Sequence, residues 1–154
     1  MRYLLLDRIT DIKYDSYANG VKCVSLSEDF LEYHFPMNPI FPGALTIESL
    51  AQLCGWLIHF SLHEKNKYNH FAILTKVERM KFNHIVTPGD RLELYAELDG
   101  IQENCAFCHV KAKSGDTVTA SGKLMFVITT INEKESAYLR DMAQILTKNM
   151  KVHS

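Results

Sequence analysis

The sequence predicts an α+β fold in which an antiparallel sheet packs on one long buried helix. The first observation is a run of strong helix formers that begins after Gly43 and continues without a proline to Glu64. The second is that apolar residues surround most of this helix and leave only a narrow polar stripe through Glu48, Gln52 and His59, as expected of a buried helix. The third is a series of apolar-polar alternating runs bounded by turn signals, which is typical of strands.

The elements follow one another in a simple order. Two strands precede the long helix, and an ordered loop with one short helical turn joins them to it, because three prolines between Glu28 and Gly43 forbid regular pairing or a continuous helix. The predicted strands are Ile9 to Tyr14, Gly20 to Leu26, His70 to Phe82, Arg91 to Leu98, Asn104 to Ala112 and Thr117 to Thr130, and the turn signals are Asn19-Gly20, Pro88-Gly89-Asp90, Asp99-Gly100 and Ser114-Gly115-Asp116. An amphipathic helix over 132–150, with Asn132 as its N-cap, ends the chain as an extension of a single domain over 1–154.

Composition excludes several classes of protein. With 154 residues, 47% of them apolar, and a net charge of −1, the chain has no overall field for nucleic acid or anionic lipid and no convincing membrane span. The apolar run Met1 to Leu6 is followed by charges and lacks a small-residue cleavage site, so we expect no signal peptide and a cytoplasmic protein with reduced thiols. Cys105 and Cys108 form a lone CxxC without a second pair, which indicates strand packing rather than zinc, and we expect no metal or cofactor.

The proline-rich loop and the first turns of the long helix carry a candidate acid and base. Prolines restrict the backbone around His34, so its imidazole is held in place as a general base, although a lone histidine in such a loop is more often a structural hydrogen-bonding group. Glu48 lies about one turn inside an apolar helix, where burial favours the protonated carboxyl. A helix-dipole carboxylate or a partner for Gln52 is the structural alternative for Glu48. With His34 reaching the same end of the helix, the two residues become an acid-base pair.

Gly43 stands at the expected start of the helix. Free backbone N–H groups and the positive end of the helix dipole attract developing negative charge there, so such a site can polarise a carbonyl group. Having no side chain, the glycine lets that carbonyl approach the backbone closely. An ordinary Pro-Gly turn explains the same dipeptide.

The stretch HFPMNPIFPGALTIESLAQ, from His34 to Gln52, resembles the HFPxxPxxPGxLxxExxAQ signature of the 3-hydroxyacyl-[acyl-carrier-protein] dehydratases. A second stretch, KFNHIVTPGDRL from Lys81 to Leu92, is similar to the family's later PGD segment, and the likeness spans Glu28 to Phe126. The resemblance implies a hotdog fold, a curved antiparallel sheet wrapped around one long helix. This agrees with the pattern inferred from the residues alone.

The resemblance also implies a reaction. In the family a histidine takes the C2 proton of a (3R)-3-hydroxyacyl thioester, an acidic residue protonates the departing 3-hydroxyl, and helix N-terminal amides hold the carbonyl. Here those roles fall to His34, Glu48 and Gly43, with Tyr33 and Gln52 as further substrate-binding candidates. The expected product is a trans-2-enoyl thioester of fatty-acid or related polyene or lipid biosynthesis. Glutamate at this position resembles the dehydratase-only branch.

Two partners are implied by the resemblance. Because histidine and acid commonly come from different subunits in such proteins, we expect an obligate homodimer with two composite sites; a trimer of dimers is left open. The other partner is an acyl carrier protein, which an acidic surface would bring to Arg79, Lys81 and Lys76. Asn83 and His84 stand where the family usually has basic residues, which weakens this basic patch. A solvated surface explains Arg79, Lys81 and Lys76 equally well.

Other departures leave alternatives open. Tyr33 stands where the family often has glycine, which reshapes the mouth of the acyl channel and leaves chain length open. A hotdog thioesterase would hydrolyse a similar thioester, but His34 among its prolines argues against it. A non-catalytic acyl-binding subunit is the other alternative, and the presence of both His34 and Glu48 argues against that.

Overall fold

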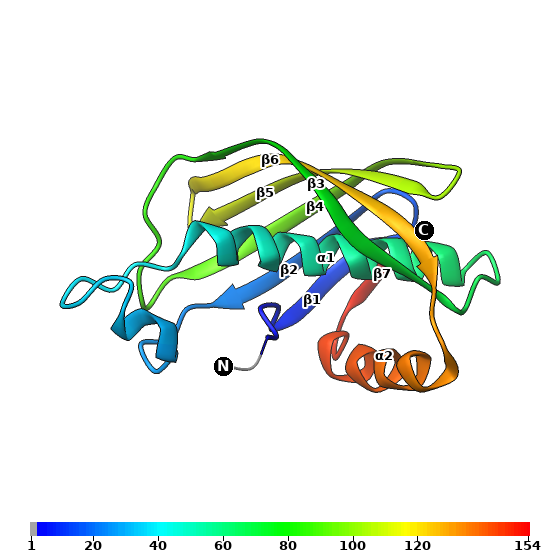
Figure 1. The fold of residues 1–154 in the computed structure, drawn as a ribbon, viewed down its shortest axis with the longest axis horizontal. Helices are drawn as coiled ribbons and strands as arrows, with labels where there is room; N and C mark the ends of the chain where they lie inside the picture. Colours follow the sequence, from blue (N-terminus) through cyan, green and yellow to red (C-terminus); the bar gives the residue numbers. More distant parts are fainter. Residues whose placement is uncertain (1–2) are drawn as a thin grey trace.

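The structure, a computed structural model, describes residues 3–154, so the first two residues of the apolar run Met1 to Leu6 lie outside it. A curved seven-stranded sheet wraps around one long helix, α1, which lies across its inner face (Figure 1). In chain order the elements are β1 (Arg8–Lys13), β2 (Tyr17–Cys23), the 3-10 helix η1 (Asp29–Glu32), α1 (Gly43–His63), β3 (His70–Phe82), β4 (Arg91–Gln102), β5 (Cys105–Ser114), β6 (Thr117–Thr130), α2 (Glu133–Leu146) and β7 (Lys151–His153).

The predicted α+β architecture is confirmed. The strand order is β3-β6-β5-β4-β2-β1-β7, and every neighbouring pair is antiparallel except β1 and β7. The long helix starts at Gly43 as predicted and packs against β2, β3, β4 and β5, so its apolar circumference fills the core. Within residues 3–154, no helix has the length and apolar character needed to span a membrane.

The predicted turn at Asn19-Gly20 is wrong, because both residues lie inside β2. The chain reverses earlier, over 14–16, where Asp15 takes a left-handed φ of 56°. Gly20 is needed in the strand for a different reason. A Cβ there would stand 2.9 Å from Leu6 Cδ1 and 3.1 Å from Leu53 Cδ1 of α1, so the glycine lets helix and sheet approach closely.

The predicted turn at Asp99-Gly100 is also wrong. β4 continues to Gln102 through a register shift between Leu98 and Gly100, and the chain turns at 103–104 with Glu103 at φ 56°. The dipeptide therefore marks a bulge within a long strand rather than its end. The structure also adds β7, a short strand that no pattern in the sequence predicted.

The C-terminal helix is present but shorter than predicted, ending at Leu146. Asn132 caps it as expected: the Asn132 side chain accepts from the Glu135 amide at 2.9 Å, and the Glu135 carboxylate accepts from the Asn132 amide at 2.9 Å. This reciprocal pair satisfies two amides that a helix start otherwise leaves free. Cys108 is buried on β5 and Cys105 lies three residues away, on the opposite face of the strand, so the CxxC residues serve strand packing as predicted.

Asp90 ties the turn before β4 to the end of β5. One carboxylate oxygen accepts from Ser114 Oγ at 2.6 Å, and the other accepts from the Thr87 amide at 2.8 Å. The hydrogen bond from Ser114, followed by that from the Thr87 amide, lowers the pKa of Asp90. Gly89, at φ 98°, supplies the left-handed residue of the turn.

Asp90→Ala is expected to lower the free energy of unfolding by about 1–2 kcal/mol at neutral pH, because it removes hydrogen bonds to a charged acceptor. Since the pKa is lowered in the folded protein, the stabilisation is complete above the ordinary carboxyl range and is lost as the pH falls through the folded value. Urea unfolding at neutral and acidic pH measures both effects. Asp116→Ala, in the exposed turn between β5 and β6, is the matched control, and an equal loss in the two variants would contradict the role of Asp90.

Candidate active site

The proline-rich loop between η1 and α1 fixes the imidazole of His34. Phe35 and Asn38 exchange two backbone hydrogen bonds of 2.9 Å, and the Ile40 amide donates to the His34 carbonyl at 2.7 Å. The Phe35 ring stacks on the imidazole with centroids 4.3 Å apart. The loop is anchored to the body of the protein by a 2.8 Å hydrogen bond from the Phe41 amide to the Val86 carbonyl.

The hydrogen bonding of His34 defines its tautomer. Nδ1 lies 2.7 Å from the Ile40 carbonyl oxygen. A carbonyl only accepts, so Nδ1 carries the proton, and in the neutral ring Nε2 holds a free lone pair. A backbone carbonyl that orients one nitrogen leaves the other available as a base.

The start of α1 lies beside this loop. Pro42 is its N-cap and contributes no side-chain cap, and the first amides that bond back are those of Leu45 and Thr46, which donate to the Pro42 carbonyl. Among the described residues, the amides of Gly43 and Ala44 have no acceptor, which leaves two donors at the positive end of the helix. A Cβ at Gly43 would stand 2.9 Å from Cε1 of Phe82, so the ring packed on this position also explains the glycine.

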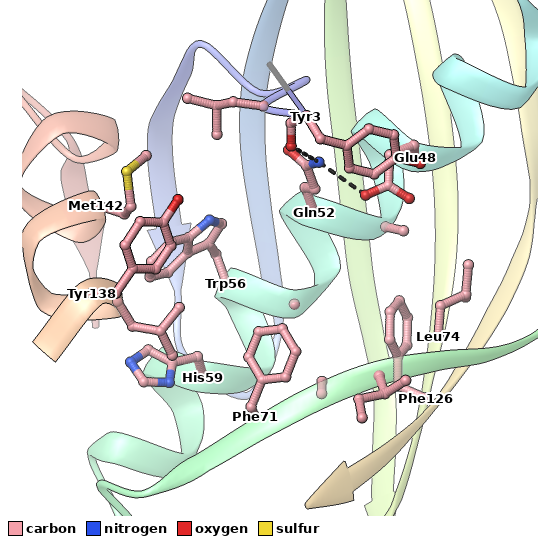
Figure 2. A pocket seen from close by; sticks show the side chains of 16 residues that line it. Tyr3, Glu48, Gln52, Trp56, His59, Phe71, Leu74, Phe126, Tyr138 and Met142 are labelled. Atoms are coloured by element: carbon pink, nitrogen blue, oxygen red, sulfur yellow. Dashed lines mark hydrogen bonds between the residues drawn. The ribbon is translucent and has the colours of Figure 1, made fainter. Parts of the chain in front are cut away.

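Glu48 belongs to a small polar network along α1. Gln52 Nε2 donates to Glu48 Oε1 at 2.9 Å and to the Tyr3 carbonyl at 3.3 Å (Figure 2). Gln52 Oε1 accepts from the Leu5 amide at 2.9 Å. Gln52 thus holds one carboxylate oxygen of Glu48, Oε1, and makes no hydrogen bond to the other, Oε2. The hydroxyl of Tyr3 lies close as well: burial, and then the charge of Glu48 and a hydrogen bond to it, raise the pKa of Tyr3.

A cavity of about 450 Å³ extends from Glu48 along the helix. Its lining is mainly apolar and aromatic, as in most sites for small molecules. The lining residues come from the N-terminal segment, α1, β3, β6 and α2, and they are Tyr3, Leu4, Glu48, Ala51, Gln52, Gly55, Trp56, His59, Phe71, Ala72, Ile73, Leu74, Phe126, Tyr138, Leu139 and Met142. Among residues 3–154, no group of three or more His, Cys, Asp or Glu side chains is placed to hold a metal ion.

Comparison with known proteins gives the chain a family. Residues 1–123 match the FabA-like domain. The 3-hydroxyacyl-[acyl-carrier-protein] dehydratase FabZ of Thermoanaerobacter sp. (strain X514) is 39% identical over 127 residues, which are 82% of this chain and 87% of that protein. The chain belongs to the 3-hydroxyacyl-[acyl-carrier-protein] dehydratase family. The resemblance noted from the sequence is therefore confirmed.

Solved structures confirm the hotdog fold of this dehydratase-family chain. A hot-dog-like protein from Thermanaerovibrio acidaminovorans matches with a TM-score of 0.62 at 18% identity, over 81% of this chain and 89% of that one. The ApeI:P dehydratase heterocomplex from Xenorhabdus doucetiae matches with a TM-score of 0.65 at 19% identity, over 90% of each chain.

The predicted site residues of this family member fall into two groups. Glu48 and Gln52 both line the cavity. The hydrogen bond between them is also the structural alternative that the sequence left open for Glu48. His34 and Tyr33 lie in the projecting loop and do not line that cavity. Tyr33 is 76% exposed and faces a separate shallow depression with Phe35 and other loop residues. In this single chain, Glu48 is half-buried, whereas its place in an apolar helix predicted full burial.

Several lining residues were missed by the sequence reasoning. Tyr3 is 45 positions from Glu48 in the chain, and Tyr138, Leu139 and Met142 belong to a terminal helix that the family signature does not include. His59 was recognised only as part of the polar stripe. The stripe was the one available signal, because it continues from Glu48 and Gln52 directly to this end of the cavity.

Proposed function

We propose that this chain dehydrates (3R)-3-hydroxyacyl thioesters of acyl carrier protein to trans-2-enoyl thioesters in fatty-acid biosynthesis. The observation that carries the proposal is the hydrogen bond of His34: its Nδ1–H is committed to the Ile40 carbonyl, which leaves Nε2 available to act as the base. The FabZ relatives, which are named 3-hydroxyacyl-[acyl-carrier-protein] dehydratases, support it.

The residues divide the elimination between them. Nε2 of His34 removes the C2 proton, the electron pair forms the C2–C3 double bond, and Glu48 protonates the departing 3-hydroxyl so that water leaves. The free amides of Gly43 and Ala44 stabilise negative charge on the thioester oxygen during the first of these steps. Gln52 holds the Glu48 carboxyl in place. Tyr33, which precedes His34 in the loop, accompanies that histidine to the entrance of the site. The proton taken by His34 returns to Glu48 through solvent, which restores both groups.

We propose further that the site is composite and that the chain works as a homodimer. Supporting this, His34 does not line the cavity that Glu48 lines, and its loop projects beyond the start of α1 (Figure 1). A second copy that brings its own loop to the cavity completes the pair and covers the half-exposed Glu48. Three expectations from the sequence stay predictions: the stacking of such dimers into a trimer of dimers, a single domain over 1–154, and a cytoplasmic location.

The edge strand β3 suits the subunit contact. It ends the sheet, and within residues 3–154 no strand pairs with its outer side. Large apolar side chains are exposed along it: Phe71, Ile73, Val77 and Phe82. A long apolar edge left in water invites uncontrolled pairing, so pairing with the same strand of a second copy about a two-fold axis protects it.

Docking of the carrier protein is proposed for the outer face of the sheet near this edge. Arg79 and Lys81 line a shallow depression together with Lys111 and Lys123, which adds two cations to those identified in the sequence. These cations outnumber the two carboxylates of the lining, Glu97 and Asp99. Lys76 instead pairs with Glu78 at 2.5 Å. Lys81 precedes Phe82, whose ring covers Gly43, so the depression adjoins the start of α1.

His34→Ala and Glu48→Gln are each expected to lower turnover by about 10²–10⁴-fold, the usual loss when a general acid or base is removed. The assay follows absorbance of the conjugated enoyl product from a 3-hydroxyacyl thioester, with free thiol measured in parallel. Thiol release without enoyl product would instead identify a thioesterase. Wild-type rates in either variant would contradict the assigned roles.

Mixing the two inactive variants under subunit exchange is expected to restore about a quarter of wild-type activity, because half of randomly formed dimers carry one intact site out of two. Each variant alone, taken through the same exchange, is the control. If labelled subunits exchange but no activity returns, each site is made by a single chain.

Arg79→Glu is expected to raise KM for the carrier-bound substrate about tenfold by reversing a charge in the docking surface, and to leave kinetics with the pantetheine thioester unchanged. Lys67→Glu is the matched control, since Lys67 is exposed beyond the opposite end of α1. An equal effect of the two variants would argue against this surface.

A further inference from the structure

The terminal helix α2 contributes to the cavity at the end farthest from Glu48. Tyr138, Leu139 and Met142 line it from this helix. Figure 2 shows Tyr138 and Met142 beside Trp56 and His59, with Glu48 on the opposite side of the view. The match to the FabA-like domain ends at residue 123, so this wall lies outside the part of the chain that the family shares.

α2 is held firmly enough to act as a wall. A capping box fixes its start, and Met142 and Leu146 are buried against the body of the protein. Beyond its end, β7 pairs with β1 from Asp11↔Lys151 to Lys13↔His153. The helix is thus anchored on both sides, whereas Leu139 between these anchors is only half-buried and faces the cavity.

The length of the cavity determines which substrates meet this wall. Along α1, Trp56 and His59 lie about 12 and 16 Å from Glu48. An extended alkyl chain with C–C bonds near 1.5 Å and angles near 111° advances about 1.25 Å per carbon. With C3 of the substrate at Glu48, a tail of about ten carbons reaches the α2 end, whereas a butanoyl chain ends close to Glu48.

The polar groups at the α2 end of the cavity are compatible with binding of an apolar acyl tail. His59 Nδ1 donates to the His70 carbonyl at 3.2 Å, and burial lowers the pKa of His59, so the ring is neutral there. Its neighbour Trp56 meets it edge to face, with centroids 5.7 Å apart. Aromatic and aliphatic side chains supply the remaining surface, which stabilises a tail by removing apolar area from water.

We propose that α2 is the distal wall of an acyl-chain site and makes this chain bind long acyl thioesters in preference to short ones. The proposal rests on the proposed function only for the position of the thioester end, near Glu48 and the start of α1. Side chains of α2 stabilise the tail beyond Trp56, and nothing on α2 touches the reacting atoms.

Trp56, the only tryptophan of the chain, reports on occupancy of the cavity without any reaction. In the His34→Ala background, dodecanoyl-pantetheine and butanoyl-pantetheine are titrated while Trp56 fluorescence is followed. Leu139→Ala is expected to weaken dodecanoyl binding about tenfold, the effect of losing contact with one buried aliphatic side chain, and to leave butanoyl binding unchanged. Tyr138→Ala, at a position 62% exposed, is a second variant that puts folding at little risk and is expected to act in the same direction.

Ile145→Ala is the matched control, because Ile145 is also 62% exposed on α2 but does not line the cavity. Equal effects on both thioesters, no effect of Leu139→Ala and Tyr138→Ala, or no saturable response of the His34→Ala protein to dodecanoyl-pantetheine would each overturn the proposal. Failure of the dehydratase assignment would be distinguishable from failure of this proposal. It would appear as absent enoyl product with the long-chain preference intact.

Discussion

Close contact between α1 and the sheet determines where Glu48, Gln52 and the start of α1 lie. At Gly20 the backbone of β2 approaches Leu53 so closely that a single added carbon would stand 3.1 Å from its side chain. At the start of the helix, the ring of Phe82 occupies the space beside Gly43 in the same way. With its apolar circumference enclosed, the helix cannot rotate without exposing core residues, so its polar stripe has one direction to face. That direction is the cavity.

The regular elements could be predicted because their signals are local and repeated. The periodicity of α1 and the alternation in β3 and β6 extend over many residues, and the structure reproduces their predicted positions. The two wrong turns were two-residue signals, and tertiary contacts overrode them: Gly20 makes room for a helix, and Gly100 sits at a bulge. β7 has only three residues and depends on a parallel partner far away in the sequence, so no local pattern could reveal it.

The candidate site shows the same difference between features that local sequence predicts and features that depend on distant parts of the chain. His34, Gly43 and Glu48 lie within one short stretch, where proline restriction and helix position can be inferred from spacing, and the hydrogen bond from His34 to Ile40 is itself local. The groups that shape the cavity come from distant parts of the chain. Tyr3 reaches Glu48 from the N-terminal segment and Leu139 arrives from α2, so only the folded chain reveals that they share one space.

The two ends of the cavity carry different physical demands, which explains why they come from different parts of the chain. Proton transfer as proposed requires a base, an acid and two amides positioned within fractions of an ångström, and the candidate groups all lie on the loop and helix of the shared domain. Binding of an alkyl tail requires only apolar area at the right distance, which any well-anchored segment can provide. A terminal helix held by its cap and by β7 meets that lesser demand without disturbing α1. Substrate length can therefore change through α2 while the geometry around Glu48 stays fixed.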